Sequence, residues 1–77
     1  MAPSTYHFKC AKAGGSWTAT AFGEKAEGMD QVSAADMNEL KKELFTACKT
    51  KSGVDTFTYQ CDMVTPTQAL FTAVISD

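Results

Sequence analysis

The chain has 77 residues, with seven basic and nine acidic side chains and a formal net charge of −2. A chain of this length forms one small domain, and folding buries roughly 60% of the surface that the unfolded chain exposes. The weakly acidic balance excludes the basic field that a phosphate-binding protein needs, so we expect no nucleic-acid partner. We therefore treat residues 1–77 as a single small α+β domain, for the reasons that follow.

The first predicted element is a strand from Thr5 to Ala11, where large apolar and polar residues alternate. The residues AGGS form a turn, and a second alternating segment runs from Trp17 to Phe22, so residues 5–22 predict a β-hairpin. The next ten residues, GEKAEGMDQV, contain two glycines and several acids without a clear period. We expect them to form a long connection between elements.

The stretch from Ser33 to Lys49 is the only segment whose apolar residues recur at helical spacing. Ser33 is a good N-cap, with Asp36 three residues further on, and Gly53 can take the left-handed conformation that ends a helix. The segment therefore predicts one amphipathic helix, whose single apolar face needs a partner.

The chain after the helix predicts a second hairpin, with strands from Thr56 to Val64 and from Ala69 to Ile75 joined by a Thr-Pro-Thr turn. Its first strand carries Tyr59 and Met63 on the same face, and it begins with TFTYQC, which resembles TYHFKC of the first hairpin. The whole pattern predicts a ββαββ arrangement, in which a four-stranded, mostly antiparallel sheet carries the helix on one face.

The predicted core lies between the helix and the apolar face of that sheet. Large side chains in so short a chain are better explained as core than as a platform for ligands. The residues expected inside are Tyr6, Phe8, Trp17, Ala19, Phe57, Tyr59, Phe71 and Ala73 of the sheet, with Met37, Leu40 and Leu44 of the helix.

The sequence offers no pattern for catalysis, metal binding or cofactor binding. His7 has no nucleophile or orienting acid in its neighbourhood, so we interpret it as an exposed strand residue. The three cysteines lack the short spacing of a zinc site, and Gly14-Gly15 lacks the GK[ST] ending of a phosphate loop. We expect no enzyme, no cofactor and no metal.

The cysteines favour a compartment and suggest a disulfide. Three cysteines in a short chain favour an oxidising compartment, although an odd count leaves one thiol without a partner within the chain. If the helix runs back across the sheet directly after the first hairpin, Cys10 and Cys48 lie at the same end. We therefore predict Cys10–Cys48 as the disulfide and Cys61 as a buried free thiol.

The last predicted strand has apolar residues on both faces, so Leu70 and Val74 are expected outside the core as a protein-contact patch. A homodimer through an edge strand is one form that such contact could take. No segment approaches the roughly 18 apolar residues of a membrane span, so we expect none. The residues MAPSTYHF lack the regions of a signal peptide, so either the protein is cytoplasmic or Met1 begins a mature, processed chain.

Two families resemble parts of this pattern. Residues 15–47, from GSWTATAF through the glycine-bearing acidic loop into the capped helix, resemble the partial RNase H-like fold of HicB-type antitoxins, without that family's proline-rich loop pattern. The whole chain, threonine-rich and cysteine-containing, resembles the killer-toxin-like effectors of fungi, which have a ββαββ core and a larger, even set of cysteines. Neither resemblance assigns a functional residue.

These observations lead to one predicted function and one alternative. We expect a non-enzymatic protein that binds another protein, most simply a secreted effector or killer-toxin-like factor. The alternative is a cytoplasmic HicB-like antitoxin or a phage-encoded inhibitor protein.

Overall fold

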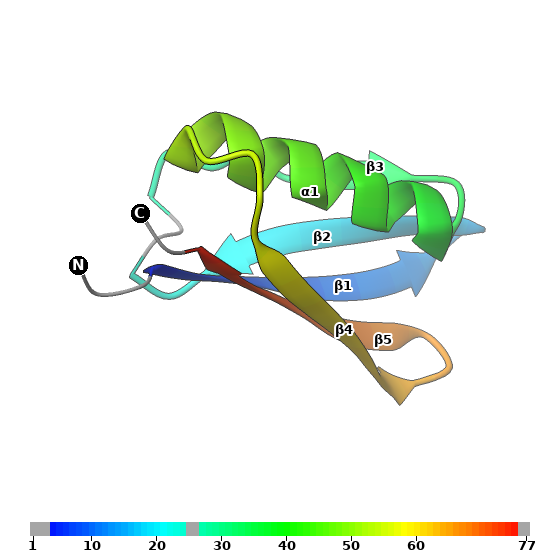
Figure 1. The fold of residues 1–77 in the computed structure, drawn as a ribbon. Helices are drawn as coiled ribbons and strands as arrows, with labels where there is room; N and C mark the ends of the chain where they lie inside the picture. The colour runs from blue at the N-terminus through cyan, green and yellow to red at the C-terminus, as the bar shows by residue number, and fades with distance from the viewer. Residues whose placement is uncertain (1–3, 25–26, 76–77) are drawn as a thin grey trace.

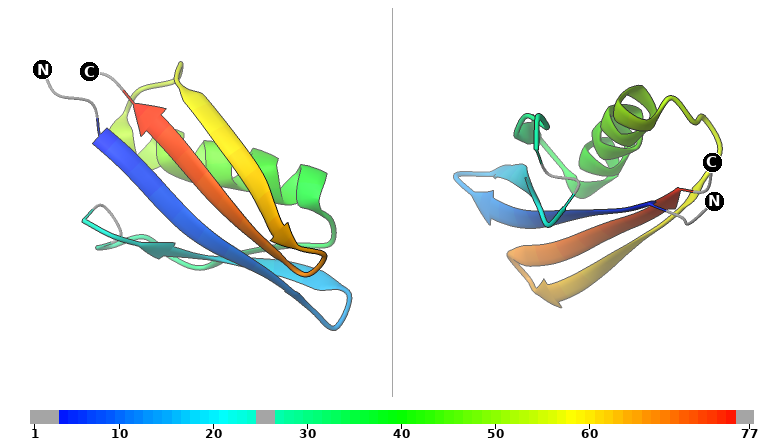
Figure 2. Two further views of the ribbon diagram at one scale, coloured as in Figure 1. Left: turned by 90° about the horizontal axis from the view of Figure 1, so that it is seen from below. Right: turned by 90° about the vertical axis from the view of Figure 1, so that its left-hand side faces the viewer.

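The computed structural model describes residues 4–24 and 27–75 (Figure 1). The described residues form β1 (Ser4–Ala13), β2 (Ser16–Phe22), β3 (Val32–Ala34), α1 (Met37–Ser52), β4 (Thr58–Thr65) and β5 (Gln68–Ile75). All strand pairs are antiparallel, and the sheet order is β3-β2-β1-β5-β4. The first and last strands therefore lie side by side in the middle of the sheet. α1 lies across one face, and the opposite face carries no helix in the described chain (Figures 1 and 2).

The predicted α+β class is confirmed, because one helix packs on an antiparallel sheet. The predicted four-stranded ββαββ arrangement is wrong, because β3 adds a fifth strand between the first hairpin and the helix. Val32, assigned from the sequence to the long connection, pairs with Ala19 of β2. A strand of three residues is too short to display a period of two, so its sequence pattern looks like that of a loop.

The first hairpin is confirmed, and its turn follows from two glycines. Gly14 and Gly15 both have positive φ, 60° and 81°, and they connect Ala13 to Ser16, which pair across the hairpin. A two-residue turn with positive φ at both positions matches the twist of the strands that it joins. Glycine adopts that conformation without the steric penalty of a side chain.

The helix begins three residues later than the sequence suggested. Asp36 is the N-cap, with extended φ and ψ, and its carboxylate accepts a hydrogen bond from the Glu39 amide at 2.9 Å. Ser33 lies in β3 instead, where its hydroxyl is 3.4 Å from that of Thr18. The expected end is confirmed, since Gly53 has a φ of 75° and its amide donates to the Lys49 carbonyl at 2.9 Å.

The core fills the space between α1 and the facing side of the sheet. Most of the predicted core residues are buried, but Phe57 and Met37 are half-buried and Tyr59 keeps 46% of its surface exposed, so its assignment to the core is wrong. α1 contributes three buried side chains to the core: Leu40, Leu44 and Cys48. The buried sheet residues are Tyr6, Phe8, Cys10, Trp17, Ala19, Ala69, Phe71, Ala73 and Ile75.

The direction of α1 is opposite to the one on which the predicted disulfide depended. Because β3 reverses the chain once more, α1 starts where β1 ends and runs back towards the start of β1 (Figure 1). Cys10 lies in the second half of β1 and Cys48 in the second half of α1, so they are displaced towards opposite ends of the core. The structure contains no Cys10–Cys48 bond, and both thiols are free. Cys61 is also free, but half-buried rather than fully buried.

Candidate protein-binding surface

The two edge strands of the described sheet, β3 and β4, differ in length and protection. β3 has three residues, whereas β4 has eight. An edge strand presents unpaired amide and carbonyl groups, which natural proteins protect with short strands, lysines, prolines or bulges. The β4 sequence, TYQCDMVT, contains no lysine or proline, one charged residue, Asp62, and a register irregularity only after Met63. Residues 58–63 are therefore a regular and weakly protected edge.

The helix side of β4 is apolar and incompletely covered. Tyr59 pairs with Ala73 and Met63 with Ala69, so these β4 residues lie on the same face as the buried alanines. Tyr59 nevertheless keeps 46% of its surface exposed, and Met63 keeps 54%. The cause is the position of α1, which lies closest to β3 and β2, at the other side of the sheet.

One flank of α1 borders this uncovered strip. Met37, Lys41 and Phe45 are four residues apart, so they lie on the same side of the helix. The Met37 sulfur lies 3.8 Å from the Cys61 sulfur. The Phe45 ring meets the Tyr59 ring edge-on, with centroids 5.8 Å apart. This flank thus contacts the inner part of the strip and leaves its outer part open.

Tyr59 is fixed by aromatic contacts on its inner side. Its ring stacks on Phe71 with centroids 5.3 Å apart, and Phe71 in turn meets Phe8 in the core at 6.0 Å. A large aromatic side chain held by the core and exposed on its other side loses little conformational freedom when a partner covers it. Tyr59 is for that reason a suitable anchor for a protein contact. We call Tyr59, Met63, Val64 and the regular edge 58–63 the β4 surface.

None of the three cysteine thiols has a pKa lowered towards neutrality. Burial raises the pKa of Cys10 to about 11, with a further contribution from Cys61, and burial alone raises that of Cys48 to about 11. Burial also raises the pKa of Cys61, against an opposing effect of the Lys41 ammonium. A reactive cysteine needs a lowered pKa that supplies the thiolate near neutral pH. The raised pKa values keep all three thiols mostly protonated near neutral pH, so reactions that need the thiolate are slow there.

The predicted contact residues Leu70 and Val74 lie on the outer, helix-free face, as expected. They belong to β5, however, which is an inner strand and offers no free edge. Leu70 is half-buried between Lys9 and Asp62 on the neighbouring strands, and Val74 is 40% exposed. The structure therefore separates this pair from the edge.

His7 lies on the same outer face. Its ring stacks on Phe22 with centroids 5.3 Å apart, and the Lys9 ammonium lies 5.5 Å from the centre of the Phe22 ring. These contacts explain why Phe22, at 36% exposure, is tolerated on the surface. They include neither a nucleophile nor an orienting carboxylate.

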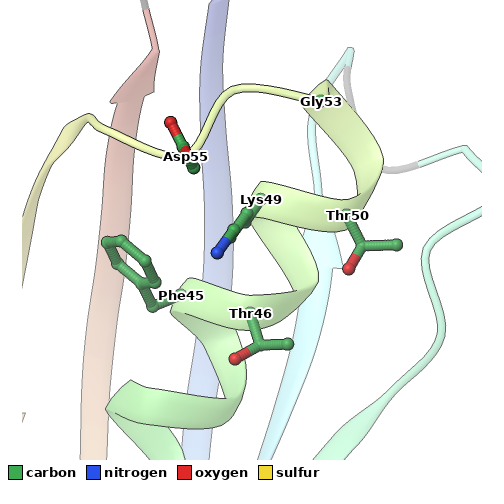
Figure 3. A pocket seen from close by; sticks show the side chains of 6 residues that line it. All are labelled: Phe45, Thr46, Lys49, Thr50, Gly53 and Asp55. Atoms are coloured by element: carbon green, nitrogen blue, oxygen red, sulfur yellow. The ribbon is translucent and has the colours of Figure 1, made fainter.

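A shallow hollow lies beside the C-terminal half of α1 (Figure 3). Lys49 and Asp55 enter it from the helix and from the following loop, and neither a histidine nor a cysteine lines it. Within residues 4–24 and 27–75, no three histidine, cysteine, aspartate or glutamate side chains gather closely enough to hold a metal ion. The hollow therefore presents one ammonium and one carboxylate and no other charged side chain.

No protein-family model, curated protein or solved structure matches this chain. The resemblances to HicB-type antitoxins and to killer-toxin-like effectors accordingly stay predictions. In the described chain, no helix has the length and apolar character to cross a membrane.

Sequence reasoning placed Tyr59 and Met63 on the correct face but missed the β4 surface. The signal that could have found it is the width of one helix compared with the width of the sheet. A helix is about 10 Å wide and strands are about 4.8 Å apart, so one helix covers two or three strands and not four or five. Which strand is left uncovered depends on the strand order, which the sequence pattern does not contain. Phe45, next to the predicted stripe on α1, was missed for the same reason.

Proposed function

We propose that this chain is a non-enzymatic protein that acts by binding another protein along the β4 surface. The observation that carries the proposal is a regular edge strand beside exposed apolar side chains: Tyr59 at 46%, Met63 at 54% and Val64 at 66%. An extended partner segment can add a strand to such an edge, with main-chain hydrogen bonds giving affinity and alternate side chains giving specificity. Apolar residues on the partner strand would cover Tyr59 and Met63.

The setting that we propose first is secretion, as an effector or killer-toxin-like factor. The density of cysteines in a small chain supports it. The second candidate is a cytoplasmic antitoxin or phage-encoded inhibitor, and the placement of the cysteines favours it. Cys10 and Cys48 are displaced along the core from each other, and all three thiols are free, as in proteins of reducing compartments. Both candidates act through protein binding and need no catalytic residue.

Three variants test the binding surface. Partners are captured on the immobilised chain from an extract of its native source, identified, purified, and titrated against each variant. Met63→Lys places a charge on the β4 surface, Leu70→Asp with Val74→Asp changes the outer face of β5, and Thr20→Lys is a control at an exposed position of β2. We expect Met63→Lys to weaken binding at least tenfold, as loss of an apolar anchor does. The control should bind like the parent chain.

The alternative outcomes are distinct. Loss of binding in the Leu70→Asp, Val74→Asp variant with full binding in Met63→Lys would move the surface to the outer face of the sheet. Equal binding by all variants would contradict both surfaces.

A mass measurement separates the two settings. Protein from its native source is analysed without reductant. A mass two hydrogens below the fully reduced value, together with a processed N-terminus, supports secretion. Three free thiols in protein isolated without reductant support the cytoplasmic alternative.

A further inference from the structure

We propose that the β4 surface binds a second copy of this chain, with the two β4 strands antiparallel about a two-fold axis at Cys61. The inference rests on the proposed function, because it takes the β4 surface as the binding site and assigns its partner. The inference follows from the pairing register in which two antiparallel β4 strands have complementary side chains.

Symmetry limits the register to a few choices. In an antiparallel pair, directly opposed residues point to the same face. A two-fold axis that relates two β4 strands must therefore pass between one residue and the same residue of the second copy. The regular part of β4 is residues 58–63, since the register shifts between Met63 and Thr65. An axis at Cys61 opposes residues 59–63 to residues 63–59, which uses five regular positions. An axis at Gln60 also uses five, from 58 to 62, but leaves Met63 outside the ladder.

The side chains distinguish these registers. With the axis at Cys61, Tyr59 lies opposite Met63 of the second copy, so the two exposed apolar residues cover one another twice. A methionine sulfur against an aromatic ring is a favourable contact. With the axis at Gln60, Tyr59 lies opposite Cys61 and Met63 stays exposed. An axis at Asp62 opposes two like charges, which is destabilising.

The polar face supports the same register. With the axis at Cys61, Gln60 lies opposite Asp62 of the second copy on the outer face. These two residues are already complementary within one chain, where the Gln60 amide donates to both Asp62 carboxylate oxygens at 2.9 and 3.0 Å. Across the axis, the Gln60 amide of one copy can donate to the Asp62 carboxylate of the other. The register is therefore complementary on both faces.

The fold leaves room for this pairing. β4 is an outermost strand of the sheet (Figure 2), and the backbone of α1 approaches β3 and β2 more closely than it approaches β4. Two copies related by an axis perpendicular to the sheet extend it into one continuous sheet, with both helices on the same face. The flanks of the two helices at Phe45 then face one another across the strip formed by Tyr59 and Met63.

The first test is the oligomeric state of the whole chain by sedimentation from about 1 to 500 μM. We expect a monomer–dimer equilibrium and a change with charge at Gln60. Gln60→Lys places a cation opposite Asp62 and should tighten the dimer several-fold, whereas Gln60→Glu places like charges opposite one another and should weaken it several-fold. Position 60 is exposed, so neither change disturbs the core. Thr20→Glu, on β2, is the matched control and should have no effect.

The second test reads the register from Cys61. Opposed residues in an antiparallel ladder have Cα atoms about 4.5 to 5.5 Å apart, within the range of about 4.4 to 6.8 Å that a disulfide spans. With oxidised glutathione, two Cys61 thiols should form one disulfide and release two molecules of reduced glutathione. Cleavage after lysine leaves each cysteine in a separate peptide, and Cys61 in residues 52–77. We expect the 52–77 peptide linked to its own copy.

The outcomes separate this proposal from the proposed function. A monomer at all concentrations without the linked 52–77 peptide overturns the second copy as partner, while the Met63→Lys titration still tests β4 against another protein. A dimer whose affinity is the same in both Gln60 variants forms through another surface and also overturns the proposal.

Discussion

The two hairpins of this protein start from similar strands and end in different environments. TYHFKC of β1 and TFTYQC before and within β4 share a pattern of alternating aromatic residues that ends in cysteine. In β1, Tyr6, Phe8 and Cys10 are buried, because strands lie on both sides and α1 lies above. In β4, Tyr59 is exposed and Cys61 is half-buried. The same strand pattern thus yields buried core in one hairpin and an exposed apolar surface in the other.

Strand order therefore decides whether the apolar face of a strand is buried or exposed. β1 occupies the middle of the sheet because β5 returns to pair with it, and this leaves β4 at the edge. α1 follows β3 in the chain and lies closest to β3 and β2, so it covers that half of the sheet more than β4. Four predictions test how sharply the two regions differ.

The largest effect is expected where α1 meets the covered part of the sheet. Leu44 is completely buried, so Leu44→Ala should lower the free energy of unfolding by about 2 to 5 kcal/mol. Urea denaturation measures the change. Phe45→Ala, one residue away on the half-covered flank, should cost less. A loss below about 0.5 kcal/mol for Leu44→Ala would mean that the helix face is exposed.

The next effect is a loss of stability at alkaline pH from the two most buried thiols. The pKa of Cys10 and of Cys48 lies at about 11 in the folded chain, against 9.0 ordinarily. Below pH 9 both states hold the proton, and between pH 9 and 11 the unfolded chain loses it first. Stability should therefore fall over that range, by about 1 kcal/mol for each thiol after allowance for solvent screening. Cys48→Ala should show a shallower fall, and equal slopes would contradict the account.

A smaller effect is expected at the start of the helix. Asp36→Ala removes the hydrogen bond to the Glu39 amide and should cost about 1 kcal/mol. Ser33→Ala, three residues earlier in β3, should cost less than about 0.5 kcal/mol, because Ser33 caps nothing. Thermal denaturation of the two variants compares the sites. The reverse order would place the helix start at Ser33.

The smallest effect is expected on the β4 surface itself. Met63 is 54% exposed, so Met63→Thr should change the stability of the monomer by less than about 0.5 kcal/mol. The measurement is made at low concentration, where association does not contribute. A loss of 2 kcal/mol or more would show that Met63 belongs to the core and not to a binding surface.

Much of the fold could be predicted from alternation and helical spacing. Strands with large residues, such as Tyr6 and Phe8, display a period of two, and the helix displays its stripe through Leu40 and Leu44. The start of the helix could not be predicted uniquely, because Ser33 and Asp36 are both good N-caps. Ser33 is excluded as the cap because it pairs with Thr18 in the sheet, and Asp36 caps the helix instead. The local pattern contained no information on that pairing.

The candidate site was less predictable for a related reason. The sequence assigned faces correctly at Leu70 and Val74, which lie outside the core, and at Tyr59 and Met63, which lie on the helix side. The sequence could not show which strands lie at the edges of the sheet, because the strand order depends on the pairing of β1 with β5, which are far apart in the sequence. Contacts between residues so far apart in sequence leave no periodic signal. The β4 surface is a consequence of those contacts.

The most direct test of the account is amide hydrogen exchange along residues 59–63, measured by NMR at low and at high protein concentration. We expect alternate β4 amides to exchange rapidly in dilute protein, while those of β1 are protected by strands on both sides. The rapid β4 amides should become protected as concentration rises. Protection of every β4 amide in dilute monomer, or rapid exchange of the same amides at all concentrations and with every partner, would contradict the assignment of β4 as the binding edge.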